Sequence, residues 1–279
     1  MTASSLTAAL FMYSLPETAA YEAAWWDGLS RHLRDAGVAD VPAALAGSGN
    51  PMRVWQAPNL LLSQTCGFPL THGLAGRVRY VATPRYRAPG CVGANYSSRI
   101  LVRADDRRGA DLEAYREARF AYNEANSQSG LNALRAALAE QLGGQTSQTP
   151  FFAQGIETGG HRKSIASVRA GEADICAVDA VTHALLDRYA GHEVAGLQTI
   201  AWSPSAPGLP FITASTRSDA EVAQLQDGLA AAFTDDGLVD IREGLLLDGL
   251  SVLPGDAYAP IGEMARRSDF FFSHGLCKS

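Results

Sequence analysis

The sequence has 279 residues, of which 47% are hydrophobic and 19% are charged, and its formal net charge is −6 at neutral pH. This composition is typical of a folded globular protein and excludes an intrinsically disordered chain. The acidic balance excludes nucleic acid and acidic membrane surfaces as favoured partners, and no apolar run approaches the roughly 20 residues that span a bilayer.

The first third of the sequence contains apolar, strand-like segments and one long helix. An apolar run at residues 6–13 predicts a buried strand, and residues 14–37 repeat apolar side chains on one helical face. Three further segments have the apolar content and the partial alternation of strands. They are residues 58–67, 77–86 and 97–106.

The middle of the sequence alternates regularly between short strands and helices. The predicted strands are residues 119–124, 151–160 and 173–180, and the helices that follow them are residues 131–142, 161–170 and 181–189. Strands that alternate with helices of this length form mostly parallel sheets through right-handed crossovers. We therefore expect an α/β fold in which helices flank mostly parallel sheets.

The last part of the sequence again contains strands, at residues 197–204 and 209–217, and then a helix at residues 218–233. Because similar strands precede and follow the regular middle block, we expect two lobes, one of which is discontinuous. Lobe 1 consists of residues 1–100 and 200–279, and lobe 2 consists of residues 101–199. Two crossing strands are expected to act as the hinge.

Small polar residues gather at the start of two predicted helices of lobe 2. Ser127, Gln128, Ser129 and Gly130 precede the first helix, and two glycines precede His161, which begins the second. Ligands of open α/β sheets bind outside the carboxyl ends of the strands, where helices begin. The first amides of a helix lack intrahelical partners and carry partial positive charge, so they bind anions. We therefore interpret the two turns as halves of one anion-binding site.

Each of these residues also has a purely structural interpretation. Serine and glycine before a helix form an ordinary N-cap, and a histidine at a helix start is commonly a solvated cap. Asp179 occupies the corresponding position in the third strand–helix unit, where it either caps the next helix or meets an ammonium group of the ligand. The occurrence of such turns in consecutive units favours the anion-binding interpretation.

The sequence lacks the motifs of several common enzyme classes. It has no GxSxG elbow, no HExxH motif and no Walker or Rossmann glycine pattern, so we expect no catalytic residue and no cofactor. Two histidines near Asp187 form only a weak metal pattern, and we expect no metal site. The four cysteines have no CxxC spacing, and the sequence leaves open whether Cys66 and Cys91 form a disulfide.

The residues around the two turns resemble a known family. The motif NSQSG at residues 126–130, followed by TGGHRKSIASVRAGEADICAVD at residues 158–179, is similar to the signature of ABC-transporter substrate-binding proteins for phosphate, phosphite and phosphonates. The segments WQAPNLLLSQTCGFPL and GCVGANYSSRILVRADD also look like this family, so the resemblance covers nearly the whole chain. It implies the type II periplasmic binding protein fold, in which two lobes close on a ligand.

The resemblance implies a solute-binding protein that captures a small oxyanion (phosphate, phosphite or a phosphonate) for an ABC importer. The family pattern assigns the phosphoryl oxygens to the turn at residues 127–130 and to His161. Gln128 is larger than the Thr or Ser often found at its position, and we expect it to narrow or to repurpose the pocket. The remaining ligand-binding residues that the resemblance implies are Tyr13, Gln64, Thr65, Tyr96 and Asp179.

The expected partners are the small oxyanion and an ABC permease, and we expect a monomer that does not bind nucleic acid. A periplasmic location follows from the resemblance, whereas the first 14 residues lack the basic region of a signal peptide, which keeps a cytoplasmic location as the alternative. The alternative function is that of a cytoplasmic sensor or an enzyme that uses the same fold for another small anionic metabolite.

Overall fold

The computed structural model describes residues 5–47, 49–143, 149–271 and 276–277. The chain divides into two compact units, each described by itself below. Unit 1 consists of Met1–Arg87, Val92–Ala94 and Pro207–Ala257, and unit 2 consists of Ala88–Cys91, Asn95–Ala206 and Tyr258–Ser279. Unit 2 includes the C-terminal segment, which the sequence analysis places in lobe 1. Among the described residues, no helix has the length and apolar character needed to cross a membrane.

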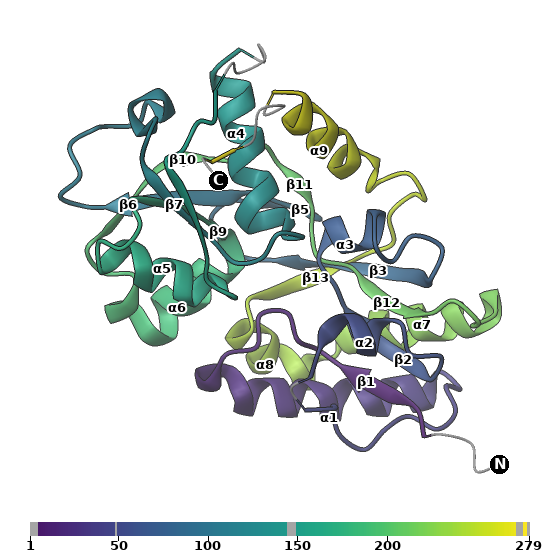
Figure 1. Cartoon of the computed structure of the whole chain (residues 1–279). Helices are drawn as coiled ribbons and strands as arrows, with labels where there is room; N and C mark the ends of the chain where they lie inside the picture. Colours follow the sequence, from purple (N-terminus) through teal and green to yellow (C-terminus); the bar gives the residue numbers. More distant parts are fainter. Residues whose placement is uncertain (1–4, 48, 144–148, 272–275, 278–279) are drawn as a thin grey trace. The chain divides into compact units, whose positions relative to one another are not determined.

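Unit 1 contains a five-stranded sheet with helices packed against it (Figure 1). The strand order is β1-β2-β12-β3-β13. The strands are β1 (Thr7–Ala9), β2 (Leu60–Gln64), β3 (Val78–Tyr86), β12 (Phe211–Ala214) and β13 (Leu247–Ser251). The helices are α1 (Ala19–Asp35), α2 (Pro51–Trp55), α3 (Gly67–Thr71), α7 (Asp219–Thr234) and α8 (Val239–Gly244). The predicted first strand is present but shorter, and the long helix that follows it is present.

The sheet of unit 1 is mixed, and the prediction of a mostly parallel sheet is wrong here. β1 and β2 run parallel, but β12 runs antiparallel to both β2 and β3, and β13 runs antiparallel to β3. The chain leaves unit 1 after β3 and returns into β12. Two neighbouring strands run parallel only when a crossover connection returns the chain to the end of the sheet from which it started. β3 leads the chain out of unit 1 and β12 leads it back, so these two neighbours run in opposite directions.

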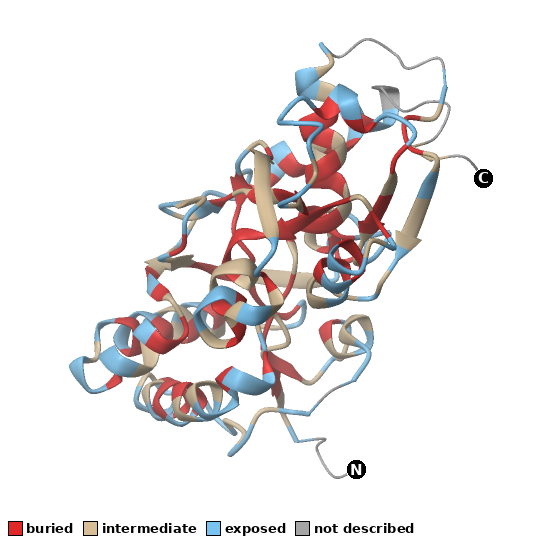
Figure 2. Ribbon diagram, turned by 90° about the vertical axis from the view of Figure 1, so that its left-hand side faces the viewer, coloured by how far each residue is buried: buried red, intermediate tan, exposed pale blue. Residues whose placement is uncertain are grey.

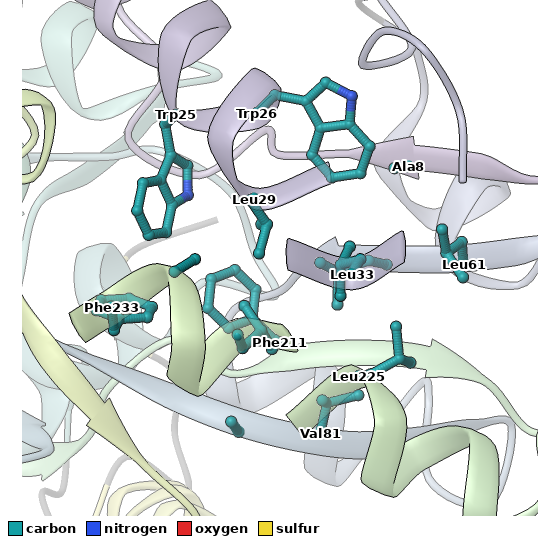
Figure 3. Close-up of a cluster of buried hydrophobic side chains, with 14 of the residues drawn as sticks. Ala8, Trp25, Trp26, Leu29, Leu33, Leu61, Val81, Phe211, Leu225 and Phe233 are labelled. Carbon is teal, nitrogen blue, oxygen red and sulfur yellow. The ribbon is translucent and has the colours of Figure 1, made fainter. Parts of the chain in front are cut away.

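The core of unit 1 lies between the sheet and helices α1 and α7 (Figure 3). α1 contributes Trp25, Trp26, Leu29 and Leu33, none of which is more than 2% exposed. Their spacing of three or four residues places most of them on one helical face. α7 approaches α1 so closely that a Cβ at Gly228 would lie 2.9 Å from Leu33 Cα and 3.1 Å from the Leu33 amide nitrogen.

Replacing Gly228 by alanine is expected to destabilise unit 1, because the added methyl group meets backbone atoms of α1 that cannot rotate away. Separating the two helices costs about 1–3 kcal/mol, the usual range for an overpacked core. Urea unfolding followed by tryptophan fluorescence measures the change, since Trp25 and Trp26 lie in the same core. Gly255→Ala is the matched control, because a Cβ there meets no atom within 4 Å. Equal losses in the two variants contradict the close approach.

Unit 2 contains a second five-stranded sheet, in the order β10-β6-β9-β7-β8. The strands are β6 (Ser98–Arg103), β7 (Arg119–Tyr122), β8 (Gln154–Glu157), β9 (Ile175–Asp179) and β10 (Leu197–Trp202). The helices are α4 (Ala133–Gln141), α5 (His161–Arg169), α6 (Ala180–Ala190) and α9 (Ala259–Phe271).

The sheet of unit 2 positions the candidate site. β7, β8 and β9 run parallel, as the strand–helix alternation predicts, whereas β6 and β10 run antiparallel to their neighbours. α4 covers one face of the sheet and has α9 packed against it, and α5 and α6 lie on the other face (Figure 1). The central strands are largely buried between these layers (Figure 2). The carboxyl ends of the three parallel strands therefore share one edge, where α4, α5 and α6 begin.

Three short strands lie at or next to the residues where the chain passes between the units. They are β4 (Cys91–Val92), β5 (Asn95–Tyr96) and β11 (Ala206–Pro207). A hinge at these crossing segments stays a prediction.

None of the four cysteines forms a disulfide in the described part of the chain, so Cys66 is not joined to Cys91. Burial raises the pKa of the Cys176 thiol to about 12. Burial, and then the nearby Asp179 carboxylate, raise the pKa of Cys91 to about 12. Both thiols are protonated at neutral pH and lack the thiolate form that nucleophilic catalysis requires.

Candidate anion-binding site

A π-helical turn, Gln128–Asn132, leads from the loop after β7 into α4. Ser127 is its N-cap, and the Ser127 hydroxyl accepts a hydrogen bond of 2.9 Å from the Gly130 amide. The sequence analysis begins this helix at residue 131, so the observed helical conformation starts earlier. The first amides of a helix lack intrahelical acceptors, and π-helical turns occur frequently at functional sites. Ser127 satisfies one of these amides, and the others are the groups that an anion would use.

A side-chain contact brings the two predicted turns together. Ser129 Oγ lies 2.8 Å from Nε2 of His161, the first residue of α5. The backbone supports this arrangement, because the Gly159 amide donates a hydrogen bond of 2.8 Å to the Asn123 carbonyl. The loops that follow β7 and β8 are therefore tied to each other, and the N-termini of two helices lie side by side. That these turns bind a ligand stays a prediction.

His161 is neutral at physiological pH. Burial lowers its pKa to about 4, and a hydrogen-bonding contribution from the Ala177 backbone only partly opposes this shift. A neutral imidazole carries one hydrogen, and the surrounding hydrogen bonds decide which nitrogen holds it. When Nδ1 holds the hydrogen, Nε2 accepts from the Ser129 hydroxyl; when Nε2 holds it, Nε2 donates to Ser129 Oγ and leaves the Ser129 hydroxyl hydrogen available to an anion. His161 then orients a donor without adding positive charge.

We expect acid to destabilise unit 2 through His161. Its pKa in the folded protein, about 4, lies below the ordinary value of 6.5, so the unfolded chain binds more protons between these two values. The stability is therefore complete above about pH 6.5 and is lost as the pH falls toward 4, by roughly 2 kcal/mol at pH 4.5.

Urea unfolding of the wild type and of His161→Gln at pH 7 and pH 4.5 measures this loss. The wild type should lose about 2 kcal/mol more than the variant on acidification. His183, whose pKa burial also lowers to about 4, is present in both proteins and cancels in the comparison. Equal losses in the two proteins would show that protonation of His161 does not oppose folding.

Asn123 covers the turn and accounts for the glycine at position 130. A Cβ at Gly130 would lie 1.7 Å from Asn123 Oδ1 and 3.3 Å from Ser127 Oγ. Asn123 Oδ1 is buried and has no hydrogen-bond partner among the described residues, a state that folded proteins usually avoid. The sequence analysis does not single out Asn123. Its place directly after β7, at the edge of the sheet where ligands bind, is the signal that identifies it.

The Gln128 side chain lies inside unit 2. It is 1% exposed, and its Nε2 donates a hydrogen bond of 3.1 Å to Sδ of Met264 on α9. Its Oε1 is buried and has no hydrogen-bond partner among the residues that the structure describes. A side chain that narrows or repurposes the pocket is the prediction for Gln128, whereas the structure joins this side chain to α9. A contact between the Gln128 backbone and a ligand stays a prediction.

Asp179 and Tyr96 are both buried in unit 2. Asp179 caps α6, because its Oδ1 accepts hydrogen bonds of 2.8 Å and 3.2 Å from the amides of Val181 and Thr182. The hydrogen bonds of Asp179 Oδ1 are therefore those of an N-cap, as the structural interpretation of Asp179 predicts. Tyr96 lies on β5 and is 4% exposed. Ligand contacts of both residues stay predictions.

In unit 1, Tyr13 and Gln64 both contact Tyr86. The rings of Tyr13 and Tyr86 meet edge to face with centroids 4.9 Å apart, and Gln64 Nε2 donates a hydrogen bond of 3.2 Å to the Tyr86 hydroxyl. Tyr13 has a φ of 63°, a conformation that is uncommon outside glycine and clusters at functional sites. The amide of buried Thr65 donates a hydrogen bond of 3.0 Å to the Pro210 carbonyl. Tyr86, the aromatic residue that ends β3, is not among the site residues predicted from the sequence.

Comparison with known proteins connects this architecture to one family. Over residues 70–252 the sequence matches the family described as "ABC transporter, phosphonate, periplasmic substrate-binding protein". None of the curated proteins matches the sequence.

Solved structures share the fold at low sequence identity. A binding protein component of an ABC phosphonate transporter from Pseudomonas aeruginosa is 15% identical, with a TM-score of 0.74 over 95% of this chain and 87% of that chain. PhnD1 from Prochlorococcus marinus in complex with methylphosphonate is 14% identical, with a TM-score of 0.72 over 94% of this chain and 97% of that chain. A protein from Xanthomonas citri bound to ATP is 15% identical, with a TM-score of 0.69 over 97% and 99% of the two chains.

The family match covers more than half of the chain, and the structural likeness extends over nearly all of it. The family is a substrate-binding component of transporters and not an enzyme. The predictions of the family and of a two-lobed α/β fold are therefore confirmed. The chain belongs to the family of periplasmic substrate-binding proteins of phosphonate ABC transporters, and it has the type II periplasmic binding protein fold.

Proposed function

We propose that this protein binds a small phosphonate through residues 127–130, which we call the anion turn, and through His161, and presents it to an ABC permease. The observation that carries this proposal is the hydrogen bond of 2.8 Å between Ser129 Oγ and His161 Nε2. It joins the N-termini of two helices, each of which supplies amide donors and partial positive charge. A protein of the same fold is known in complex with methylphosphonate, which supports this ligand class.

The chemistry of the anion turn fits a tetrahedral oxyanion. Its donors are backbone amides and the hydroxyls of Ser127 and Ser129, and the adjacent His161 is neutral. The helix dipoles stabilise the negative charge of the ligand, and hydrogen bonds to a charged acceptor are about twice as strong as neutral ones. A phosphonate presents three oxygens, which suits donors that arrive both from the anion turn and from α5. A planar carboxylate presents only two oxygens.

Isothermal titration of the wild-type protein with methylphosphonate, aminoethylphosphonate, phosphite and phosphate tests the proposed ligand class. We expect saturable binding of one ligand per chain for at least one phosphonate. Acetate, which has the same charge sign but no tetrahedral group, serves as the control and should not bind at the same concentrations. Failure of all four phosphorus compounds to bind would contradict the proposed function.

In transport, the protein would deliver the bound phosphonate to an ABC permease. The family works with an ABC importer, so the phosphonate-loaded protein is expected to stimulate ATP hydrolysis by its cognate transporter in proteoliposomes. The ligand-free protein at the same concentration is the control. Equal stimulation by the loaded and the free protein would contradict a role in ligand delivery.

A further inference from the structure

The C-terminal helix α9 is attached to the anion turn, although more than 120 residues separate them in the sequence. α9 packs against α4 and against the π-helical turn that precedes α4 (Figure 1). Its Met264 accepts the hydrogen bond from Gln128 Nε2 at 3.1 Å. Gln128 lies between Ser127 and Ser129, the two residues whose hydroxyls we assign to the ligand. α9 therefore contacts the middle of the anion turn.

Among the described residues, Met264 Sδ is the one hydrogen-bond partner of the Gln128 side-chain amide. The side chain is 1% exposed, and its Oε1 has no hydrogen-bond partner among the described residues. A buried amide that loses its remaining partner is strongly disfavoured, because it has given up its hydrogen bonds to water. Without the sulfur of Met264, the side chain would have to rotate toward another partner, and the backbone of the anion turn would move with it.

A second contact holds α9 in place beside the turn. Arg135 on α4 forms an ion pair of 2.5 Å with Asp269 on α9. The Arg135 side chain is 16% exposed, so this pair is partly shielded from solvent on the α4 side. Within α9, the Ser268 hydroxyl donates a hydrogen bond of 2.8 Å to the carbonyl of Met264. The Gln128–Met264 and Arg135–Asp269 contacts therefore connect α9 to the turn and to α4 at two points.

From these contacts we infer that Met264 is a positioning residue for the anion turn, acting through Gln128. This inference rests on the proposed function, since it names the helix that sets the geometry of that ligand site. Gln128 affects ligand affinity through the orientation of the backbone on either side of it, and its side chain points to α9. The bulk of residue 128 is therefore accommodated inside unit 2.

The simpler alternative is that Met264 only fills space, as methionine often does in cores. Met264→Leu separates the two explanations, because leucine has nearly the same volume but no sulfur acceptor, and such exchanges are usually well tolerated. Space filling predicts unchanged affinity. Positioning predicts methylphosphonate affinity about five- to tenfold weaker, together with a lower thermal unfolding midpoint, because the buried side-chain amide of Gln128 loses its partner. Met52→Leu, on α2 of unit 1, is the matched methionine control and should change neither quantity.

A double-mutant cycle shows whether Met264 acts through Gln128. In a Gln128→Leu background the amide is already gone, so Met264→Leu should cause no further loss of affinity. Equal losses with and without Gln128 would contradict the inference. So would an affinity of Met264→Leu equal to that of the wild type, when the wild type itself binds methylphosphonate.

Amide chemical shifts of the ligand-free protein provide a readout that does not require binding. We expect Met264→Leu to shift the backbone amides of residues 127–130, and Met52→Leu to leave them unchanged. Shifts confined to α9 would overturn the inference. If the wild type binds no phosphonate but these shifts appear, the proposed function fails while the mechanical link between α9 and the turn stands.

Discussion

Replacing Ser127 and Ser129 together by alanine is expected to weaken methylphosphonate binding at least about 100-fold, because each hydroxyl bond to a charged acceptor contributes roughly 1.5–3 kcal/mol. Both serines belong to the buried anion turn, where they flank Gln128, and Ser129 Oγ is additionally hydrogen-bonded to His161. Isothermal titration of the double variant against the wild type measures the loss.

The control for this prediction must separate ligand binding from helix capping. Ser127 also caps the π-helical turn, so its removal costs stability of about 1 kcal/mol, as at other N-caps. Ser218 caps α7 of unit 1 in the same way, with its hydroxyl accepting from the Glu221 amide at 3.3 Å. Ser218→Ala should lower stability by a similar amount and leave affinity unchanged. An unchanged affinity in the double variant would refute the site, but not the fold.

Replacing Phe120 by alanine is expected to destabilise unit 2 by about 3–5 kcal/mol, the range for removal of a buried aromatic ring. Phe120 lies on β7 and is 2% exposed, and its ring stacks with the rings of Phe152 and Tyr122 at centroid distances of 4.6 Å and 5.3 Å. β7 is paired with β8 on one side and β9 on the other, so the backbone cannot close the cavity.

Urea unfolding measures the effect of Phe120→Ala, and a phenylalanine of unit 1 provides the comparison. Phe68 is only partly buried and stacks on His72 with centroids 3.9 Å apart. Phe68→Ala should cost about 1 kcal/mol or less, because Phe68 already lies partly exposed at the surface. A loss below about 1 kcal/mol for Phe120→Ala would show that the core around β7 repacks easily and does not hold the anion turn rigidly.

Local sequence signals predict much of unit 2. Helix α5 begins at His161, as predicted, because two glycines end the preceding strand segment and an apolar face follows. The apolar run that ends at Asp179 forms the fully buried strand β9, and the helix predicted after it is α6. In these segments the periodicity and the capping residues all favour one structure, so no long-range contact is needed to choose between alternatives.

Long-range packing decides the features that the sequence analysis misses. An amphipathic C-terminal helix must bury its apolar face, but its own sequence does not indicate which unit provides the surface. The strands before and after the middle block predict that this segment belongs to lobe 1, whereas α9 packs in unit 2. The early start of the helix at Gln128 likewise involves a distant partner, because Met264 on α9 accepts the hydrogen bond from the Gln128 side chain. Tyr86 is identified as a neighbour of the predicted site residues by its contacts with Tyr13 and Gln64 in the folded chain.

A crystal structure of the protein with bound methylphosphonate tests the central claim most directly. The account predicts phosphonate oxygens within hydrogen-bonding distance of the backbone amides of the anion turn and of Ser129 Oγ, with His161 Nε2 still bonded to that hydroxyl. The methyl group should point away from both helix N-termini, because these termini bind the charged oxygens. Phosphonate bound elsewhere, with the anion turn and His161 making no contact to it, would contradict the account.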